Sequence, residues 1–131
     1  MNKQEMFTKA YLGLQAQGWK QSIIGTTCRY RGPEGLKCAI GHLIPDDKYQ
    51  SYWESSSIAY LLGRFPLLVG LHVTQEDVTF LEHLQRAHDQ YAIRLELDEE
   101  SKGKAELRKF DDMRAAFLEL ASLHNLSVPK E

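Results

Sequence analysis

Apolar side chains recur every three or four residues in three long stretches of this chain, and this helical period constrains the fold more than any other feature. Such spacing gives a helix one apolar face that has to pack against a core. The first stretch opens with Asn2 and Glu5 at the spacing of a capping box and stops at Gly18. Long helices are therefore predicted over residues 3–17, 75–95 and 104–125.

The segment after the first helix has a different character. Ile23 and Tyr30 stand among β-branched and aromatic residues, which favour extended structure. Gly32 opens a Gly-Pro-Glu-Gly sequence, which is typical of a turn. We expect a small β-hairpin within residues 22–40. Its two arms are predicted at residues 28–31 and 36–39.

Two sets of capping residues follow the hairpin. Asp46 begins a short helical turn, and Ser57 with the serines before it offers an N-cap for a second short helix, which Pro66 ends. Short helices are thus predicted within residues 46–65. A chain of 131 residues has the length of one domain, residues 1–131. The predicted fold is mainly α with a small β part (α+β), about four helices around one core with the hairpin inserted after the first.

Composition excludes several classes of protein. Hydrophobic residues make up 43% of the chain and charged residues 26%, which is typical of a globular protein rather than a disordered one. No stretch is long and apolar enough to span a bilayer, and no signal peptide opens the chain, so we expect a cytoplasmic protein without membrane contact. Two cysteines are too few for a disulfide scaffold. Phosphate-binding glycine loops are missing, and no cofactor is expected.

The net charge of −2 conceals an asymmetry along the chain. Six basic against two acidic side chains give residues 1–45 a net charge of +4, and ten against sixteen give residues 46–131 a net charge of −6. The positive part concentrates at Arg29, Arg31 and Lys37. Bulk nucleic-acid binding is not expected from such a total, but a local site for an anionic group is.

Residues 28–49 are the densest in chemically distinctive side chains. They contain a Tyr-Arg-Gly-Pro turn and a Cys-Ala-x-Gly-x-Leu-Ile-Pro-Asp stretch. In these motifs the chain resembles small uncharacterised proteins of phages and prophage-bearing bacteria. The resemblance implies a viral or prophage origin, with the host cytoplasm as location, and it specifies no mechanism. The matching residues are Tyr30, Arg31, Gly32, Pro33, Gly35, Cys38, Ala39, Gly41, Leu43, Ile44, Pro45, Asp46 and Tyr49.

Three hypotheses compete for this segment, and the first is a metal site. Cys28, Cys38 and His42 are zinc-type ligands that the hairpin and the following turn would bring together. The nine-residue gap between the cysteines matches no standard zinc finger, so two small, buried, reduced cysteines are the alternative. Zinc would need a fourth ligand, taken from His72, His83 or His88.

The second hypothesis is covalent catalysis by Cys38, with His42 four positions further on as its base. A thiolate beside an imidazole is the minimum for a cysteine nucleophile. Gly41 and Pro45 oppose the regular helix that would place both side chains on one face. We therefore favour a protein without catalytic activity, and Cys38 and His42 are the catalytic pair of the alternative, a small Cys/His-dependent enzyme.

The third hypothesis, ligand or partner binding, is preferred. Arg29, Arg31 and Lys37 would project beside Tyr49 and Trp53, and together these types supply phosphate contacts, stacking and cation–π attraction. We predict a non-enzymatic phage accessory protein that sequesters or blocks a host component, such as a defence protein or a nucleotide signal. Its ligand would be a host protein or an anionic small molecule. A zinc-stabilised or nucleic-acid-associated module is a further alternative.

Two features outside this segment complete the sequence analysis, an apolar surface and a histidine. Apolar area from Tyr52, Trp53 and residues 67–71 favours burial in a homodimer. His88 lies with the apolar residues of its predicted helix, where a hydrogen-bonded core histidine is the simplest interpretation. His88 and the adjacent Asp89 can nevertheless meet the hairpin in space.

Overall fold

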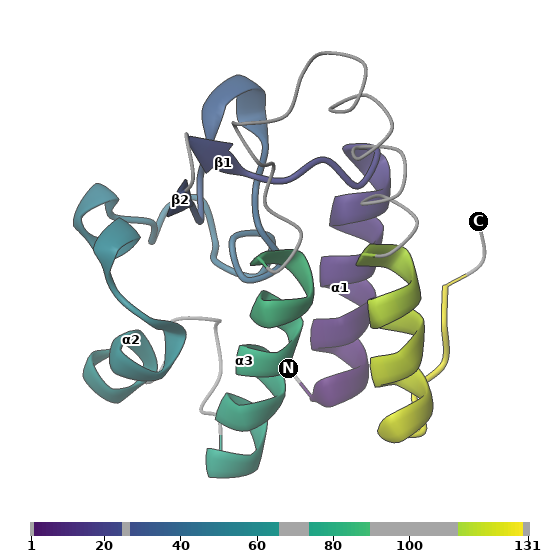
Figure 1. Cartoon of the computed structure of the whole chain (residues 1–131). Helices are drawn as coiled ribbons and strands as arrows, with labels where there is room; N and C mark the ends of the chain where they lie inside the picture. The colour runs from purple at the N-terminus through teal and green to yellow at the C-terminus, as the bar shows by residue number, and fades with distance from the viewer. Residues whose placement is uncertain (1, 25–26, 66–73, 90–112, 130–131) are drawn as a thin grey trace.

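The computed structural model confirms a mainly helical fold with a small β element (Figure 1). Two long helices, α1 (Lys3–Ala16) and α3 (Gln75–Asp89), stand beside a third helical segment of residues 113–123. The shorter elements lie to one side of this group, between α1 and α3 in the chain order. The structure describes residues 2–24, 27–65, 74–89 and 113–129.

The capping residues of α1 act as the sequence predicted. Asn2 Oδ1 accepts the backbone N–H of Glu5 at 2.8 Å, and Glu5 Oε1 accepts the backbone N–H of Asn2 at 3.2 Å. Beyond the last turn, Gly18 adopts a φ of +70°, a left-handed conformation that costs glycine nothing. The predicted helix over residues 3–17 is therefore confirmed to within one residue.

The start of α3 is confirmed as well. Thr74 and Asp77 exchange hydrogen bonds of 3.1 and 3.2 Å between side chains and backbone amides, so two N–H groups without helical partners are satisfied. Within the predicted ranges 75–95 and 104–125, residues 90–95 and 104–112 lie outside the described part of the chain. The described residues 113–123 are helical, as predicted.

The hairpin prediction needs correction. The paired strands are β1 (Ile23–Ile24) and β2 (Thr27–Cys28), antiparallel, so only the start of the predicted 28–31 arm is in a strand. In the described chain, the predicted arms 28–31 and 36–39 meet in one bridge, between Arg31 and Lys37, across the 3₁₀ turn η1 (Pro33–Gly35).

The reason for this difference lies in the second predicted arm. Cys38, Ala39 and Ile40 are all fully buried. A strand turns alternate side chains to opposite faces, so it would bury one or two of these three against a single core. A tight turn buries all three, and the backbone here forms turns instead of extended structure.

The two short helices predicted within residues 46–65 are present. They are the 3₁₀ helix η2 (Ser51–Ser55) and α2 (Ile58–Arg64). Ser57 caps α2 as predicted, because its hydroxyl accepts the backbone N–H of Tyr60 at 3.1 Å. Asp46 lies in a turn rather than at the start of a helix.

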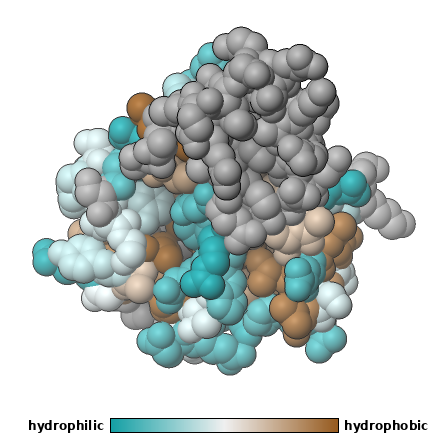
Figure 2. Space-filling view, in the orientation of Figure 1, coloured by the Kyte–Doolittle hydropathy of each residue, from teal (hydrophilic) through white to brown (hydrophobic). Residues whose placement is uncertain are grey.

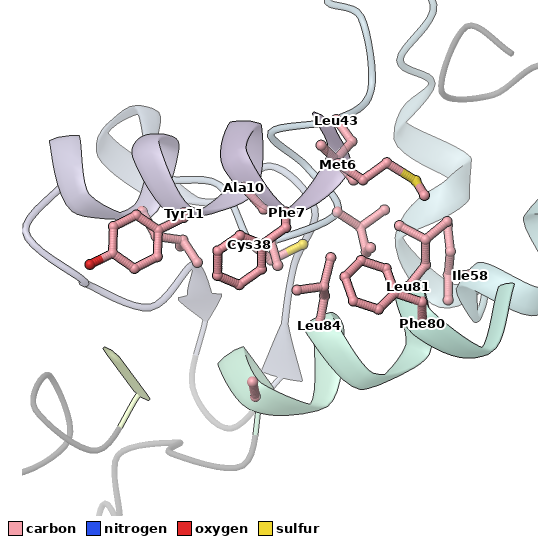
Figure 3. Close-up of a cluster of buried hydrophobic side chains, with 14 of the residues drawn as sticks. Met6, Phe7, Ala10, Tyr11, Cys38, Leu43, Ile58, Phe80, Leu81 and Leu84 are labelled. Atoms are coloured by element: carbon pink, nitrogen blue, oxygen red, sulfur yellow. The ribbon is translucent and has the colours of Figure 1, made fainter. Parts of the chain in front are cut away.

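Buried side chains from every described helix and from the turn at residues 38–44 form one hydrophobic cluster (Figure 3). Phe7 of α1 lies 6.1 Å from Phe117, ring centre to ring centre, which ties α1 to the C-terminal helical segment.

In the described residues, no helix is both long and apolar enough to cross a membrane. The surface in Figure 2 is mostly hydrophilic over α3, with apolar patches beside residues 113–123.

Candidate functional site

A cavity of about 360 Å³ lies between α3 and the part of the chain that runs from β2 to α2. This volume is within the range of ligand-binding pockets, near its lower end. Seven of the ten lining residues are charged or are Ser or Gln, and the lining comes from three stretches of chain that are far apart in the sequence, residues 28–30, 54–58 and 82–89. The residues that line this cavity are Cys28, Tyr30, Glu54, Ser56, Ser57, Ile58, Glu82, Gln85, Arg86 and Asp89.

The cavity is acidic. Three of its lining side chains are carboxylates, those of Glu54, Glu82 and Asp89, against the one guanidinium of Arg86. Tyr30 closes one wall, where its hydroxyl donates to the carbonyl oxygen of Ser56 at 2.6 Å and burial raises the pKa of its phenol. The phenol is therefore a fixed, neutral part of the wall.

Glu54 holds the wall together. Its carboxylate accepts the backbone N–H groups of Tyr30 at 2.8 Å and Arg31 at 3.0 Å, and also the hydroxyl of Tyr49. Arg29 Nε lies 3.7 Å from the same carboxylate, whose side chain is only 9% exposed. Since a buried carboxylate needs partners for its charge, these contacts fasten η2 to residues 29–31.

His88 and Asp89 form the opposite corner. His88 is fully buried, its Nε2 accepts the backbone N–H of Ser22 at 3.1 Å, and its Nδ1 lies 2.8 Å from Asp89 Oδ1. Gln85 Nε2 donates to the same Oδ1 at 2.8 Å. Because an accepting Nε2 carries no proton, the neutral ring has its proton on Nδ1 and donates it to Asp89.

Cys28 completes this corner. One ligand atom from each of Cys28, His88 and Asp89 lies within 4.8 Å of the other two. This group differs from the predicted metal set of Cys28, Cys38 and His42. Among the described residues, Cys38 and His42 join no such group with Cys28, because the turn at residues 38–43 buries Cys38 in the core and places His42 against Gln17. The sequence did indicate that His88 and Asp89 can meet the hairpin, and they do so at β2. Of the candidate fourth ligands, His72 lies outside the described residues.

The predicted catalytic pair lacks the properties of a nucleophile and its base. Cys38 is fully buried, its Sγ accepts the backbone N–H of Gly41 at 3.3 Å, and burial raises the pKa of the thiol to about 12. His42 shares a 2.9 Å hydrogen bond with Gln17 Oε1, and burial, helped by the charge of Lys37, lowers its pKa to about 4. A protonated, solvent-shielded thiol does not attack a substrate.

The three cations of the predicted basic patch are each paired with a carboxylate of the protein. Arg31 Nη1 lies 2.5 Å and Lys37 Nζ 3.4 Å from Asp46 Oδ1, and Arg31 also donates to the carbonyl oxygen of Ile44 at 2.8 Å. The hydrogen bond from Arg31 is the main cause that holds the pKa of the Asp46 carboxyl below its usual value. The Arg31 guanidinium also lies over the ring of Tyr49, at 5.0 Å.

The aromatic member of the predicted ligand set is in the core. Trp53 is 4% exposed and packs against the rings of Tyr49, Tyr52 and Phe65, so it has no free face for stacking on a ligand. None of the five predicted ligand-binding residues lines the cavity described above. That set consists of Arg29, Arg31, Lys37, Tyr49 and Trp53.

Sequence reasoning missed most of the cavity. The residues Glu82, Gln85, Arg86 and Asp89 recur at intervals of three and four, which places them on one polar face of α3. That spacing was a usable signal. Glu54 gave no such signal in the sequence, because its partners are backbone amides more than twenty positions away.

Comparisons with known protein families, with curated proteins and with solved structures find no match to this chain.

Proposed function

We propose that this chain is a non-enzymatic binding protein of phage or prophage origin that blocks a host protein by holding one of its basic side chains in the acidic cavity. The observation that carries this proposal is the excess of carboxylates over cations in the lining. Clefts lined by one sign of charge attract the opposite charge and bind it in a fixed orientation.

Asp89 and Glu82 are the ligand-facing carboxylates of this proposal. The charge of Glu54 is already balanced by Arg29 and by two backbone N–H groups. The hydrogen bonds from His88 and Gln85 both go to Oδ1 of Asp89, so Oδ2 is the oxygen that can accept from a ligand. A guanidinium presents a planar fork of N–H donors that suits such an acceptor, with the Ser56 and Ser57 hydroxyls beside it.

The same geometry argues against the nucleotide signal that the sequence suggested as a target. An anionic phosphate needs available cations, and Arg31 and Lys37 both contact Asp46 while Arg29 contacts Glu54.

The hydrogen bonds of His88 argue against catalysis in the cavity. The imidazole of His88 accepts from Ser22 on one side and donates to Asp89 on the other, so it has no lone pair with which to accept a proton from a substrate.

The test uses N-acetylarginine amide and its neutral analogue N-acetylcitrulline amide, each titrated into the full-length ¹⁵N-labelled protein. We expect the arginine compound to shift the backbone amide signals of Gln85 and Arg86, and the citrulline compound, which has the same shape without the charge, to bind at least tenfold more weakly. Glu82→Lys reverses one charge at the cavity and should weaken arginine binding at least tenfold. Asp47→Lys makes the same change at an exposed position that does not line the cavity and should leave binding unchanged.

Equal binding of the two compounds would overturn the proposal, since charge would then play no part. Equal loss in the Glu82 and Asp47 variants would also overturn it, because it would assign the effect to the net charge of the protein rather than to the cavity.

A further inference from the structure

Three metal-binding side chains meet beside the cavity, and two of them, Cys28 and Asp89, line it. Cys28 comes from β2, and His88 and Asp89 come from the last turn of α3, sixty residues further on. One ligand atom of each lies within 4.8 Å of the other two. We propose that Cys28 Sγ, His88 Nδ1 and a carboxylate oxygen of Asp89 bind a divalent transition metal of the zinc class, with the fourth position facing the cavity.

The donor set selects the metal. Thiolate and imidazole are ligands of zinc and of its spectroscopic substitute cobalt, whereas magnesium and calcium take oxygen ligands almost alone. Ligands at zinc distances of about 2.0–2.3 Å stand roughly 3.3–3.8 Å apart around a tetrahedron. The present separations of up to 4.8 Å therefore have to close by about 1 Å at most, while His88 Nδ1 and Asp89 Oδ1, now 2.8 Å apart, have to open by about 0.5 Å.

The surroundings already hold two of the ligands in place. Gln85 Nε2 donates to Asp89 Oδ1 at 2.8 Å, which is the kind of outer contact that orients a ligating carboxylate. Gln21 Nε2 donates to the carbonyl oxygen of His88 at 2.6 Å and fixes the end of α3. On the other side, the pairing of Cys28 with Ile23 in the two-stranded sheet sets the position of the thiol. Cys28 and Asp89 are partly exposed and line the cavity, which gives the ion a path of entry.

Metal binding has a defined proton balance. In the metal-free protein, Nε2 of His88 accepts from the Ser22 amide and the ring proton is on Nδ1. Coordination by Nδ1 requires that proton to leave and Nε2 to take one up, which breaks the bond from Ser22. The Cys28 thiol loses its proton to solvent as the Cys28–metal bond forms, so about one proton is released for each ion bound.

The broken Ser22 bond lowers the metal affinity. A buried N–H group that loses its acceptor weakens binding by about 10- to 100-fold. Structural zinc sites bind tightly enough that such a loss leaves measurable affinity. We therefore expect a site of moderate metal affinity, which chelators empty.

The first experiment adds Co²⁺ to the chelator-treated full-length protein and records its absorption spectrum. We expect a thiolate-to-cobalt charge-transfer band that saturates at about one ion per chain and disappears when Zn²⁺ is added. Cys28→Ser should abolish the band, and Cys38→Ala, the control at the other cysteine, should retain it. Absence of the band in the wild-type protein, or its dependence on Cys38, would overturn the inference.

Two further measurements address the other ligands without deleting the buried histidine. Asp89→Asn should weaken Co²⁺ binding by about 10- to 100-fold. Calorimetric titration with Zn²⁺ in buffers of different ionisation enthalpy should show release of about one proton. Unchanged affinity in the Asp89 variant would remove the carboxylate from the site and contradict the assignment.

This inference does not rest on the proposed function, and the two fail separately. Glu82 is outside the ligand group, so Glu82→Lys should leave the Co²⁺ charge-transfer band in place while it weakens arginine binding. Weaker arginine binding with an intact band in the Glu82→Lys variant is the result that both proposals predict. A protein that binds arginine but gives no band rejects only the metal site.

Discussion

The backbone N–H of Ser22 donates a hydrogen bond to Nε2 of His88 at 3.1 Å, across sixty-six positions of sequence. This contact joins the chain just before β1 to the last turn of α3, and it decides which ring nitrogen carries the proton. A backbone amide is always a donor, so the imidazole nitrogen that faces it has to be the acceptor. The Nδ1–H of His88 then donates to Asp89 Oδ1, and together with the hydrogen bond from Gln85 it sets the orientation of Asp89 at the cavity.

The first prediction is that His88 is the Nδ1–H tautomer in the metal-free protein at pH 8. Nitrogen-15 chemical shifts of the imidazole distinguish a protonated from an unprotonated ring nitrogen, and long-range couplings to the ring protons assign each one. We expect Nε2 to have the unprotonated shift. Observation of the Nε2–H tautomer would contradict the hydrogen-bond assignment, and addition of Zn²⁺ should produce that tautomer only if the metal site forms.

The sequence predicted those parts of the fold that depend on local contacts. Asn2 with Glu5 and Thr74 with Asp77 are pairs three positions apart, and both form the caps that their spacing indicates. The turn at residues 38–43 could not be predicted in this way, because burial of Cys38 and its neighbours is a property of the assembled core.

In the candidate site, too, only the features that depend on local spacing could be predicted from the sequence. The polar face of α3 was readable from its spacing. The neutralisation of Arg31 by Asp46 was not, because charged side chains fifteen positions apart carry no sign of whether they pair with each other or with solvent. For this reason the sequence assigned the binding site to the basic segment, while the structure places its cavity next to it.

The second prediction concerns the two cysteines. In the native protein Cys28 should react with a thiol reagent and Cys38 should not, because Cys38 is fully buried and its thiol pKa is raised to about 12, while Cys28 is partly exposed at the cavity. Mass spectrometry after brief alkylation should show one modification per chain, which Cys28→Ser removes. Modification of Cys38 at a comparable rate would mean that the turn at residues 38–43 opens readily.

The third prediction uses two glycines as a matched pair. A Cβ at Gly41 would lie 2.0 Å from the carbonyl oxygen of Tyr30, a backbone atom that cannot move aside, so Gly41→Ala should destabilise the protein by about 3 kcal/mol or more. A Cβ at Gly63 meets nothing within 4 Å, and Gly63 is inside α2. Gly63→Ala should therefore stabilise by about 0.5–1 kcal/mol. Urea denaturation measures both changes, and equal effects would show that the close approach at Gly41 is absent.

The fourth prediction tests Glu54 as the fastening of η2. Glu54→Gln keeps the shape but replaces one accepting oxygen by an NH₂ group that faces N–H donors from Tyr30 and Arg31. The loss of a charged acceptor in a 9% exposed position should cost about 2 kcal/mol of unfolding free energy. Glu119→Gln, an exposed change of the same kind, should stay within about 0.5 kcal/mol of wild type. Similar denaturation midpoints for the two variants would reject the role given to Glu54.

The last prediction is a loss of stability in mild acid that originates at His42. Burial lowers the pKa of His42 to about 4 from its ordinary value of 6.5, and the charges of Lys37, Arg31, His88 and Lys9 act in the same direction. Between these two values the unfolded chain binds a proton that the folded chain does not, so the free energy of unfolding falls as the pH falls.

The contribution of His42 is therefore complete above pH 6.5 and is lost progressively toward pH 4. Because the ring is partly exposed and solvent screens its neighbours, we expect a loss of about 1–2 kcal/mol over this window. The control is His42→Gln, which cannot be protonated and should have a flatter stability profile over the same window. The pKa of the Asp46 carboxyl is lowered as well, but from an ordinary value of 3.8, so its effect lies below this window. Parallel profiles for wild type and His42→Gln between pH 6.5 and pH 4 would show that the ring is protonated in the folded protein as readily as in the unfolded chain.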